Sequence, residues 1–136
     1  MTYGASYDYG AQALEPAPPV PEFLIPLRDK VAGWAGISRK DLAYVLINEY
    51  RPGAPLGWHR DRPEFELVAG VSLGGRARMR LRRYPPEPRA PTLALDLEPR
   101  SAYIMRGEAR WGWQHAVSPT KELRYSVTFR TRREAS

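Results

Sequence analysis

The residues best suited to chemistry in this sequence are its two histidines, His59 and His115. His59 follows a turn rich in proline and glycine and precedes Asp61 by two positions. Residues two positions apart on an extended segment project from the same face. Two imidazoles and one carboxylate are the ligands of the facial triad, which holds non-heme Fe(II) and leaves positions open for a co-substrate and dioxygen. His59, Asp61 and His115 are therefore candidate metal ligands; the alternative is an ordinary loop histidine beside an acid.

The segment RYSVTFR, residues 124–130, is a second candidate for chemistry because its residues alternate in type. Period-two geometry places its polar residues on one face, and these are Arg124, Ser126, Thr128 and Arg130. The opposite face, which we expect to face the core, carries Tyr125, Val127 and Phe129. Two arginines inside a small barrel need an anion, and a small dicarboxylate would pair with them. The alternative is an edge strand whose polar side faces water.

One helix and six short strands are expected to position these residues. Apolar residues recur at helical spacing between Glu22 and Trp34, and they are Leu24, Leu27, Val31 and Trp34. Strand-like segments follow at residues 43–50, 65–73, 77–84, 92–98, 101–106 and 124–131, separated by glycine- and proline-rich turns. This order predicts a mainly β fold, an antiparallel sandwich or barrel with a helix packed outside.

Composition narrows the class of protein. The 136 residues suit one domain, and no apolar run reaches the roughly 18 residues that a membrane span needs. There are no cysteines, which excludes disulfides and thiolate metal sites, and we expect a cytoplasmic protein. The net charge of +6 comes mostly from arginine, which favours anionic partners, although a merely basic soluble protein has the same composition.

Taken together, NEYRPGAPLGWHRD (residues 48–61), His115 and RYSVTFR resemble the AlkB family of Fe(II)- and 2-oxoglutarate-dependent dioxygenases. The family pattern runs N-x-Y, H-x-D, a distant H and R-x-N-x-T-x-R, and the four motifs occur here in that order. The resemblance implies a double-stranded β-helix, the cupin-like jelly roll. It also implies a single dioxygenase domain over residues 22–136, preceded by an extended arm over residues 1–21 as the remnant of a nucleotide-recognition lid.

The resemblance assigns roles to individual residues. It makes His59, Asp61 and His115 the iron ligands. It implies 2-oxoglutarate contacts for Asn48, Tyr50, Arg124, Ser126 and Arg130, with Arg124 pairing with the distal carboxylate. Ser126 stands where the family commonly has asparagine, but a hydroxyl can still bind the co-substrate. Arg124 and Arg130 are separated by about 20 Å of strand, so we expect Arg130 on the metal or substrate side.

The activity implied by the resemblance is oxidative dealkylation of N-alkylated nucleic acid bases. Fe(II) is the bound cofactor, 2-oxoglutarate and O2 are consumed, and an aldehyde, succinate and CO2 are released. We expect a monomer. A phosphate-binding surface is predicted from five arginines, which are Arg76, Arg78, Arg80, Arg82 and Arg83. The alternative interpretation is that these arginines form the solvent-exposed face of an ordinary strand. Pro63 stands where many relatives have an acid that contacts the base, which favours single-stranded substrates because no paired base must be extruded.

Two other functions remain compatible with these residues. The same oxygenase chemistry could act on a protein side chain or a small molecule. A jelly roll that has lost turnover could serve as a binding module, although the complete set of His59, Asp61 and His115 argues against this.

Overall fold

A computed structural model describes residues 1–8 and 13–134, so residues 9–12 of the expected arm lie outside the described part. Strand pairing gives a five-stranded antiparallel sheet of order β1-β4-β11-β6-β9 and a four-stranded sheet of order β5-β10-β7-β8. The larger sheet contains β1 (Thr2–Tyr3), β4 (Tyr44–Tyr50), β6 (Phe65–Gly74), β9 (Ser101–Met105) and β11 (Arg124–Arg132). The smaller sheet contains β5 (Leu56–His59), β7 (Ala77–Arg83), β8 (Leu93–Leu97) and β10 (Trp113–Val117). A separate hairpin pairs β2 (Ala5–Asp8) with β3 (Ala13–Pro16).

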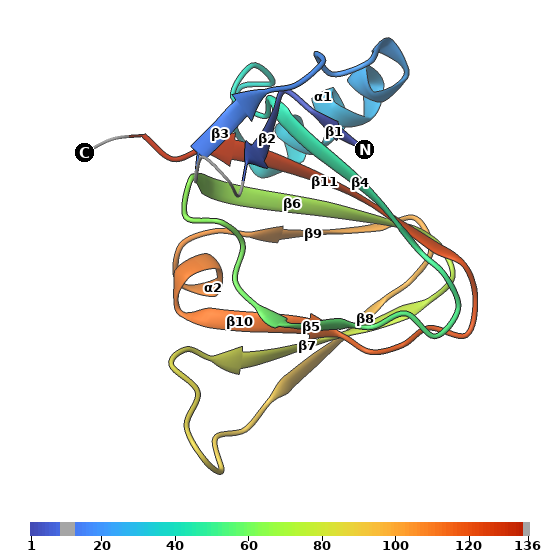
Figure 1. Ribbon diagram of the computed structural model, residues 1–136, viewed down its shortest axis with the longest axis vertical. Coiled ribbons are helices and arrows are strands. Elements are labelled where there is room, and N and C mark those ends of the chain that lie inside the picture. The colour runs from blue at the N-terminus through green and yellow to red at the C-terminus, as the bar shows by residue number, and fades with distance from the viewer. Residues whose placement is uncertain (9–12, 135–136) are drawn as a thin grey trace.

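The two sheets face one another, and helix α1 (Ile25–Ala35) lies over the outer side of the larger sheet (Figure 1). A 3-10 turn, η1 (Glu22–Leu24), leads into α1, and a short helix, α2 (Glu108–Trp111), joins β9 to β10. This arrangement confirms the expected mainly β jelly roll with one packed helix. Among the described residues, no helix is long and apolar enough to cross a membrane.

The 3-10 turn η1 and helix α1 together cover the helical segment expected between Glu22 and Trp34. Gly36 ends the helix in the left-handed conformation, with φ of 72°, which glycine adopts without steric cost. Ala32 and Ala35 lie on the buried face, whereas Trp34 is 57% exposed. The two small alanines, rather than Trp34, therefore contribute to the buried face near the end of the helix.

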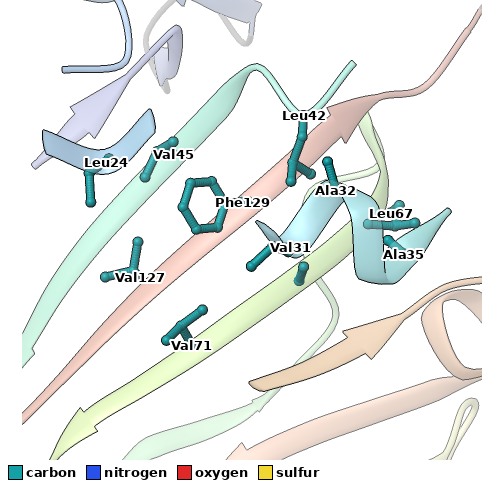
Figure 2. Close-up of a cluster of buried hydrophobic side chains, with 11 residues drawn as sticks. Leu24, Val31, Ala32, Ala35, Leu42, Val45, Leu67, Val71, Val127 and Phe129 are labelled. Carbon is teal, nitrogen blue, oxygen red and sulfur yellow. The ribbon is translucent and has the colours of Figure 1, made fainter. Parts of the chain in front are cut away.

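The main core fills the space between α1 and the larger sheet (Figure 2). Val127 and Phe129 of β11 belong to this core, and Phe129 is fully buried. Their burial confirms that one face of β11 packs against the core. Tyr125 is 39% exposed and does not join it, which contradicts the expectation. Its cross-strand partner Glu49 is also exposed, so the helix leaves this end of the sheet uncovered.

Two strands that the sequence pattern did not predict carry the histidines. His59 ends β5 and His115 is central in β10, and the two residues pair directly across these antiparallel strands. β5 has only four residues and follows the glycine- and proline-rich turn. Its formation depends on pairing with β10, which lies more than fifty residues later, and the local sequence holds no signal for this pairing.

Candidate metal and co-substrate site

A cavity of about 660 Å³ lies between the two sheets and contains the candidate site. Its lining includes all the predicted metal and co-substrate residues, namely Asn48, Tyr50, His59, Asp61, His115, Arg124, Ser126 and Arg130. The smaller sheet and the segment after β5 supply the three candidate metal ligands. The larger sheet supplies the others through β4 and β11. The fold therefore brings two distant sets of residues into one space.

The candidate metal ligands His59, Asp61 and His115 have donor atoms that all lie within 4.8 Å of one another. Oδ1 of Asp61 is 3.6 Å from Nε2 of each histidine. Nδ1 of His59 lies 2.8 Å from the Gly57 carbonyl oxygen, so a proton on Nδ1 leaves Nε2 with a free lone pair. All three residues line the cavity. This donor set fits Fe(II) with open coordination positions.

Arg130 fixes the second oxygen of Asp61. Its Nε donates to Oδ2 at 3.0 Å, and its Nη2 lies 2.9 Å from the same oxygen. The side chains of both residues are nearly buried. One carboxylate oxygen thus faces the histidines while the other is held by the guanidinium. Arg130 therefore lies on the metal side of the cavity, as the length of the strand indicated.

The electrostatics of this cluster favour the protonation state that a metal requires at Asp61 and His115, whereas the pKa of His59 is shifted in the opposite direction. Burial raises the pKa of Asp61, but the hydrogen bond with His59 and the charge of Arg130 outweigh burial and hold that pKa well below its usual range. Burial, with repulsion from His59, lowers the pKa of His115 to about 4. The hydrogen bond with Asp61 raises the pKa of His59. At neutral pH Asp61 is a carboxylate and His115 is a neutral imidazole, as metal ligation requires.

The opposite end of the cavity is formed by paired positions on β4 and β11. Asn48 is opposite Ser126, and Tyr50 is opposite Arg124. The Asn48 amide donates to the Tyr50 hydroxyl at 3.4 Å, which confirms that these two side chains share a face. The Arg124 guanidinium carbon lies 5.2 Å from the Tyr50 ring centre.

Arg124 is only 3% exposed, yet it has no carboxylate partner among the described residues. Its Nε donates to the Ser72 hydroxyl at 2.9 Å. Burial lowers the pKa of Arg124, which reflects the cost of keeping an arginine charge out of water. A buried cation without a counter-ion is expected where an anionic ligand binds.

Sequence reasoning missed Arg110, which holds the segment that carries Asp61. Arg110 is 2% exposed, and its Nη2 donates to the carbonyl oxygens of Asp61, Arg62 and Phe65 at 3.2, 2.7 and 2.8 Å. It belongs to α2, in a stretch that looks like a turn in the sequence. No local pattern indicates this contact, because its partners are backbone atoms about fifty residues earlier.

The predicted phosphate-binding arginines do not line the cavity. Buried Ala77 and Met79 alternate with exposed Arg78 and Arg80 on β7, so the arginines project from the outer face of the smaller sheet. Nε of Arg82 donates to the Gln114 side chain at 2.9 Å. Arg76 pairs with Glu98 at 2.8 Å, and Arg83 lies 3.5 Å from Glu108. The Arg80 and Arg82 guanidinium carbons lie 5.2 and 4.4 Å from the Trp58 ring centre.

Comparison with known proteins agrees with this geometry. Residues 1–133 match the 2OG-Fe(II) oxygenase superfamily. The chain belongs to this family. Its AlkB resemblance is confirmed by 32% identity over 133 residues to the alpha-ketoglutarate-dependent dioxygenase AlkB of Escherichia coli, covering 88% of this chain and 59% of that protein. The protein L905 of Acanthamoeba polyphaga mimivirus is 33% identical over 99 residues, covering 63% of this chain and 46% of that protein.

A solved structure, that of OsALKBH1, has the same fold. It superimposes with a TM-score of 0.74 over 96% of this chain and 76% of that chain, at 19% sequence identity. The jelly roll is thus shown by both the strand order and the superposition. The chain spans about half the length of the two relatives described above.

Proposed function

We propose that this protein is an Fe(II)- and 2-oxoglutarate-dependent dioxygenase that oxidatively dealkylates N-alkylated nucleic acid bases. The observation that carries the oxygenase chemistry is one cavity with His59, Asp61 and His115 at one end and the buried guanidinium of Arg124 at the other. Arg124 has no carboxylate partner among the described residues. The first set offers a metal three ligands, and the second offers a diacid its distal anchor.

The residues of the cavity have distinct tasks in this reaction. Fe(II), when bound with 2-oxoglutarate and O2, supplies hydroxylation of a carbon attached to nitrogen, with succinate and CO2 as by-products and release of an aldehyde. Arg130 keeps Oδ1 of Asp61 turned toward the histidines. Arg124 and Tyr50 anchor the distal carboxylate, and Asn48 and Ser126 line the space between.

The same cavity also has an apolar wall. Leu56, Met79 and Val117 line it from the smaller sheet, and they belong to or pack against a second hydrophobic cluster. This wall limits the access of water to the reacting groups, which strengthens the electrostatic contacts of Arg124 and Asp61. Of the three candidate ligands, His59 is the most accessible, with a third of its side chain exposed, and we expect the substrate to approach beside it.

Three observations support a nucleic acid substrate. The similar E. coli protein is AlkB, and an Arabidopsis thaliana protein that is 28% identical over 138 residues is named an alkylated DNA repair protein. Arg80 and Arg82 flank Trp58, which directly precedes the metal ligand His59, so a basic and aromatic surface begins beside the site. Arg60 lines the cavity and stacks on Tyr84, with its guanidinium carbon 3.8 Å from the ring centre. Cations and aromatic rings in this arrangement suit phosphates and unstacked bases.

We further propose a preference for single strands. Pro63 is exposed two positions after Asp61 and offers no side-chain hydrogen bond to a base. Extruding a paired base costs a few kcal/mol, which such contacts normally offset. A single strand largely avoids this cost.

Mass spectrometry of methylated substrates tests the proposal directly. The protein is incubated with Fe(II), 2-oxoglutarate and ascorbate in the presence of methylated single-stranded and duplex oligonucleotides and a peptide pool. We expect the wild-type protein to remove methyl groups from the oligonucleotides, faster on single strands than on duplexes. The Asp61→Asn variant should leave the methyl groups in place. Oxidation confined to the peptides would reject the nucleic acid substrate, and equal rates on both oligonucleotide forms would reject the strand preference. Absence of any conversion of 2-oxoglutarate to succinate would reject the oxygenase itself.

Binding measurements test the arginine surface separately. The double variant Arg80→Gln/Arg82→Gln should weaken oligonucleotide binding several-fold at low salt. The slope of the logarithm of the binding constant against the logarithm of salt concentration should become shallower by roughly two, as for the loss of two phosphate contacts. The double variant Arg39→Gln/Lys40→Gln removes the same charge from exposed positions after α1 and serves as the control. Equal losses in the two double variants would show that only net charge matters.

A further inference from the structure

Tyr103, on edge strand β9, occupies a position in the cavity that only its cross-strand partner makes possible. That partner is Gly70 on β6. A Cβ atom built on Gly70 would lie 2.5 Å from the Tyr103 hydroxyl oxygen, well inside contact distance. The phenol therefore lies directly over the backbone of Gly70, where no other residue leaves room. The ring also packs against the apolar cluster formed by Ala77, Met79, Leu97 and Val117.

Tyr103 lines the cavity that holds both the candidate metal ligands and the candidate co-substrate residues. Its charge interactions are with Asp61, Arg130 and Arg124, so it is electrostatically coupled to residues of both ends. Gly70 and Ser72 are two positions apart on β6, and the Ser72 hydroxyl holds Nε of Arg124. The phenol thus lies about 7 Å along the strand from the serine that holds this arginine.

This hydroxyl is an available donor. Among the residues that the structure describes, it has no hydrogen-bond partner, whereas the Tyr50 hydroxyl accepts from Asn48. Burial raises the pKa of Tyr103 to about 12, so the phenol keeps its proton at neutral pH. A neutral O–H beside an unpaired arginine is suited to a carboxylate, which accepts hydrogen bonds from both groups.

We propose that Tyr103 donates a hydrogen bond to the distal carboxylate of bound 2-oxoglutarate beside Arg124, and that Gly70 is required to seat its ring. The inference rests on the proposed oxygenase function. It makes Tyr103 a co-substrate residue that the motifs of the sequence do not mark. Because its hydroxyl donates a hydrogen bond, Tyr103 favours a ligand that ends in a carboxylate at this point over one that ends in a methyl group.

The test uses two ligands that differ only at the distal end. Binding of 2-oxoglutarate and of 2-oxopentanoate, in which a methyl group replaces the distal carboxylate, is measured by calorimetry with Mn(II)-loaded protein. Tyr103→Phe keeps the ring and removes the hydroxyl. We expect roughly tenfold weaker binding of 2-oxoglutarate, as for a hydrogen bond to a charged group, and unchanged binding of 2-oxopentanoate and Mn(II). Tyr125→Phe, on the same sheet but 39% exposed, is the matched control and should change nothing.

The outcomes separate this inference from the proposed function. If wild-type protein does not bind 2-oxoglutarate, both are overturned. If wild type binds it and Tyr103→Phe binds it equally well, the hydrogen bond is rejected while the oxygenase proposal stands. Equal weakening for both ligands would assign Tyr103 a packing role and also reject the bond. Gly70→Ala should displace the ring and weaken 2-oxoglutarate at least as much as Tyr103→Phe, with an unchanged circular dichroism spectrum.

Discussion

The two ends of the cavity treat their buried charges in opposite ways. At the metal end, the Asp61 carboxylate already has partners, since Arg130 holds one oxygen and the two histidines face the other. At the far end, Arg124 has the Ser72 hydroxyl but no carboxylate partner among the described residues. The metal end is therefore organised before a ligand arrives, whereas the far end is completed only by an anion.

The supports of the two ends also differ. Four residues of the far end belong to β4 and β11, which pair along the whole length of β4 inside the larger sheet, and these residues are Arg124, Ser126, Asn48 and Tyr50. Of the metal ligands, Asp61 lies in the segment after β5, outside any strand, and its backbone is held by Arg110. Damage at the metal end should therefore spread to neighbouring ligands, while damage at the far end should stay local. The following variants test this difference.

Loss of a metal ligand should have the largest effect. His115→Ala removes a buried donor from the centre of β10, and two ligands alone hold a divalent ion poorly. We expect Fe(II) affinity to fall by at least about a hundredfold, measured by anaerobic metal titration. Gln114→Ala, the adjacent residue on the same strand, is the control and should bind metal normally. Wild-type iron affinity in His115→Ala would show that the triad is misassigned.

Loss of the far anchor should have a smaller and more selective effect. Arg124→Ala removes a charge-assisted contact that contributes on the order of 1.5–3 kcal/mol, so 2-oxoglutarate should bind roughly tenfold or more weakly. Iron affinity should remain within about twofold because the strands stay intact. Arg132→Ala, at the exposed end of the same strand, should leave both affinities unchanged. An unchanged affinity for 2-oxoglutarate in Arg124→Ala would contradict the assignment of the anchor.

The far end is also the part that the sequence predicted best. Period-two alternation was sufficient to place Asn48 and Tyr50 on one face of their strand, and Arg124 and Ser126 on one face of theirs. The structure shows that both faces line the same cavity. The strand length likewise placed Arg130 away from Arg124, which its pairing with Asp61 confirms. Where side chains follow from local backbone geometry, the sequence contains enough information.

The metal end was predicted from residue types and motif order, not from its supporting structure. β5 and β10 were missed because short strands beside glycine and proline form only through their mutual pairing. Arg110 and Tyr103 were missed for a related reason. Arg110 contacts backbone carbonyls distant in sequence, and Tyr103 depends on the absence of a side chain at Gly70. Such tertiary contacts leave no periodic signal.

The smallest expected effect on ligand binding concerns Arg110, and it decides whether the metal end depends on its support. Arg110→Met keeps much of the buried volume but removes the guanidinium that donates to the carbonyl oxygens of Asp61, Arg62 and Phe65. We expect iron affinity to fall only several-fold, because the three ligands remain, and the free energy of unfolding to fall by about 2–4 kcal/mol. Arg110→Lys should recover part of the iron affinity by supplying one cationic donor. Arg83→Met, which loses only an exposed contact with Glu108, is the control for removing an arginine charge near α2. If Arg110→Met loses stability but keeps full iron affinity, Asp61 is held by Arg130 alone, and the two ends of the cavity are equally independent of distant support.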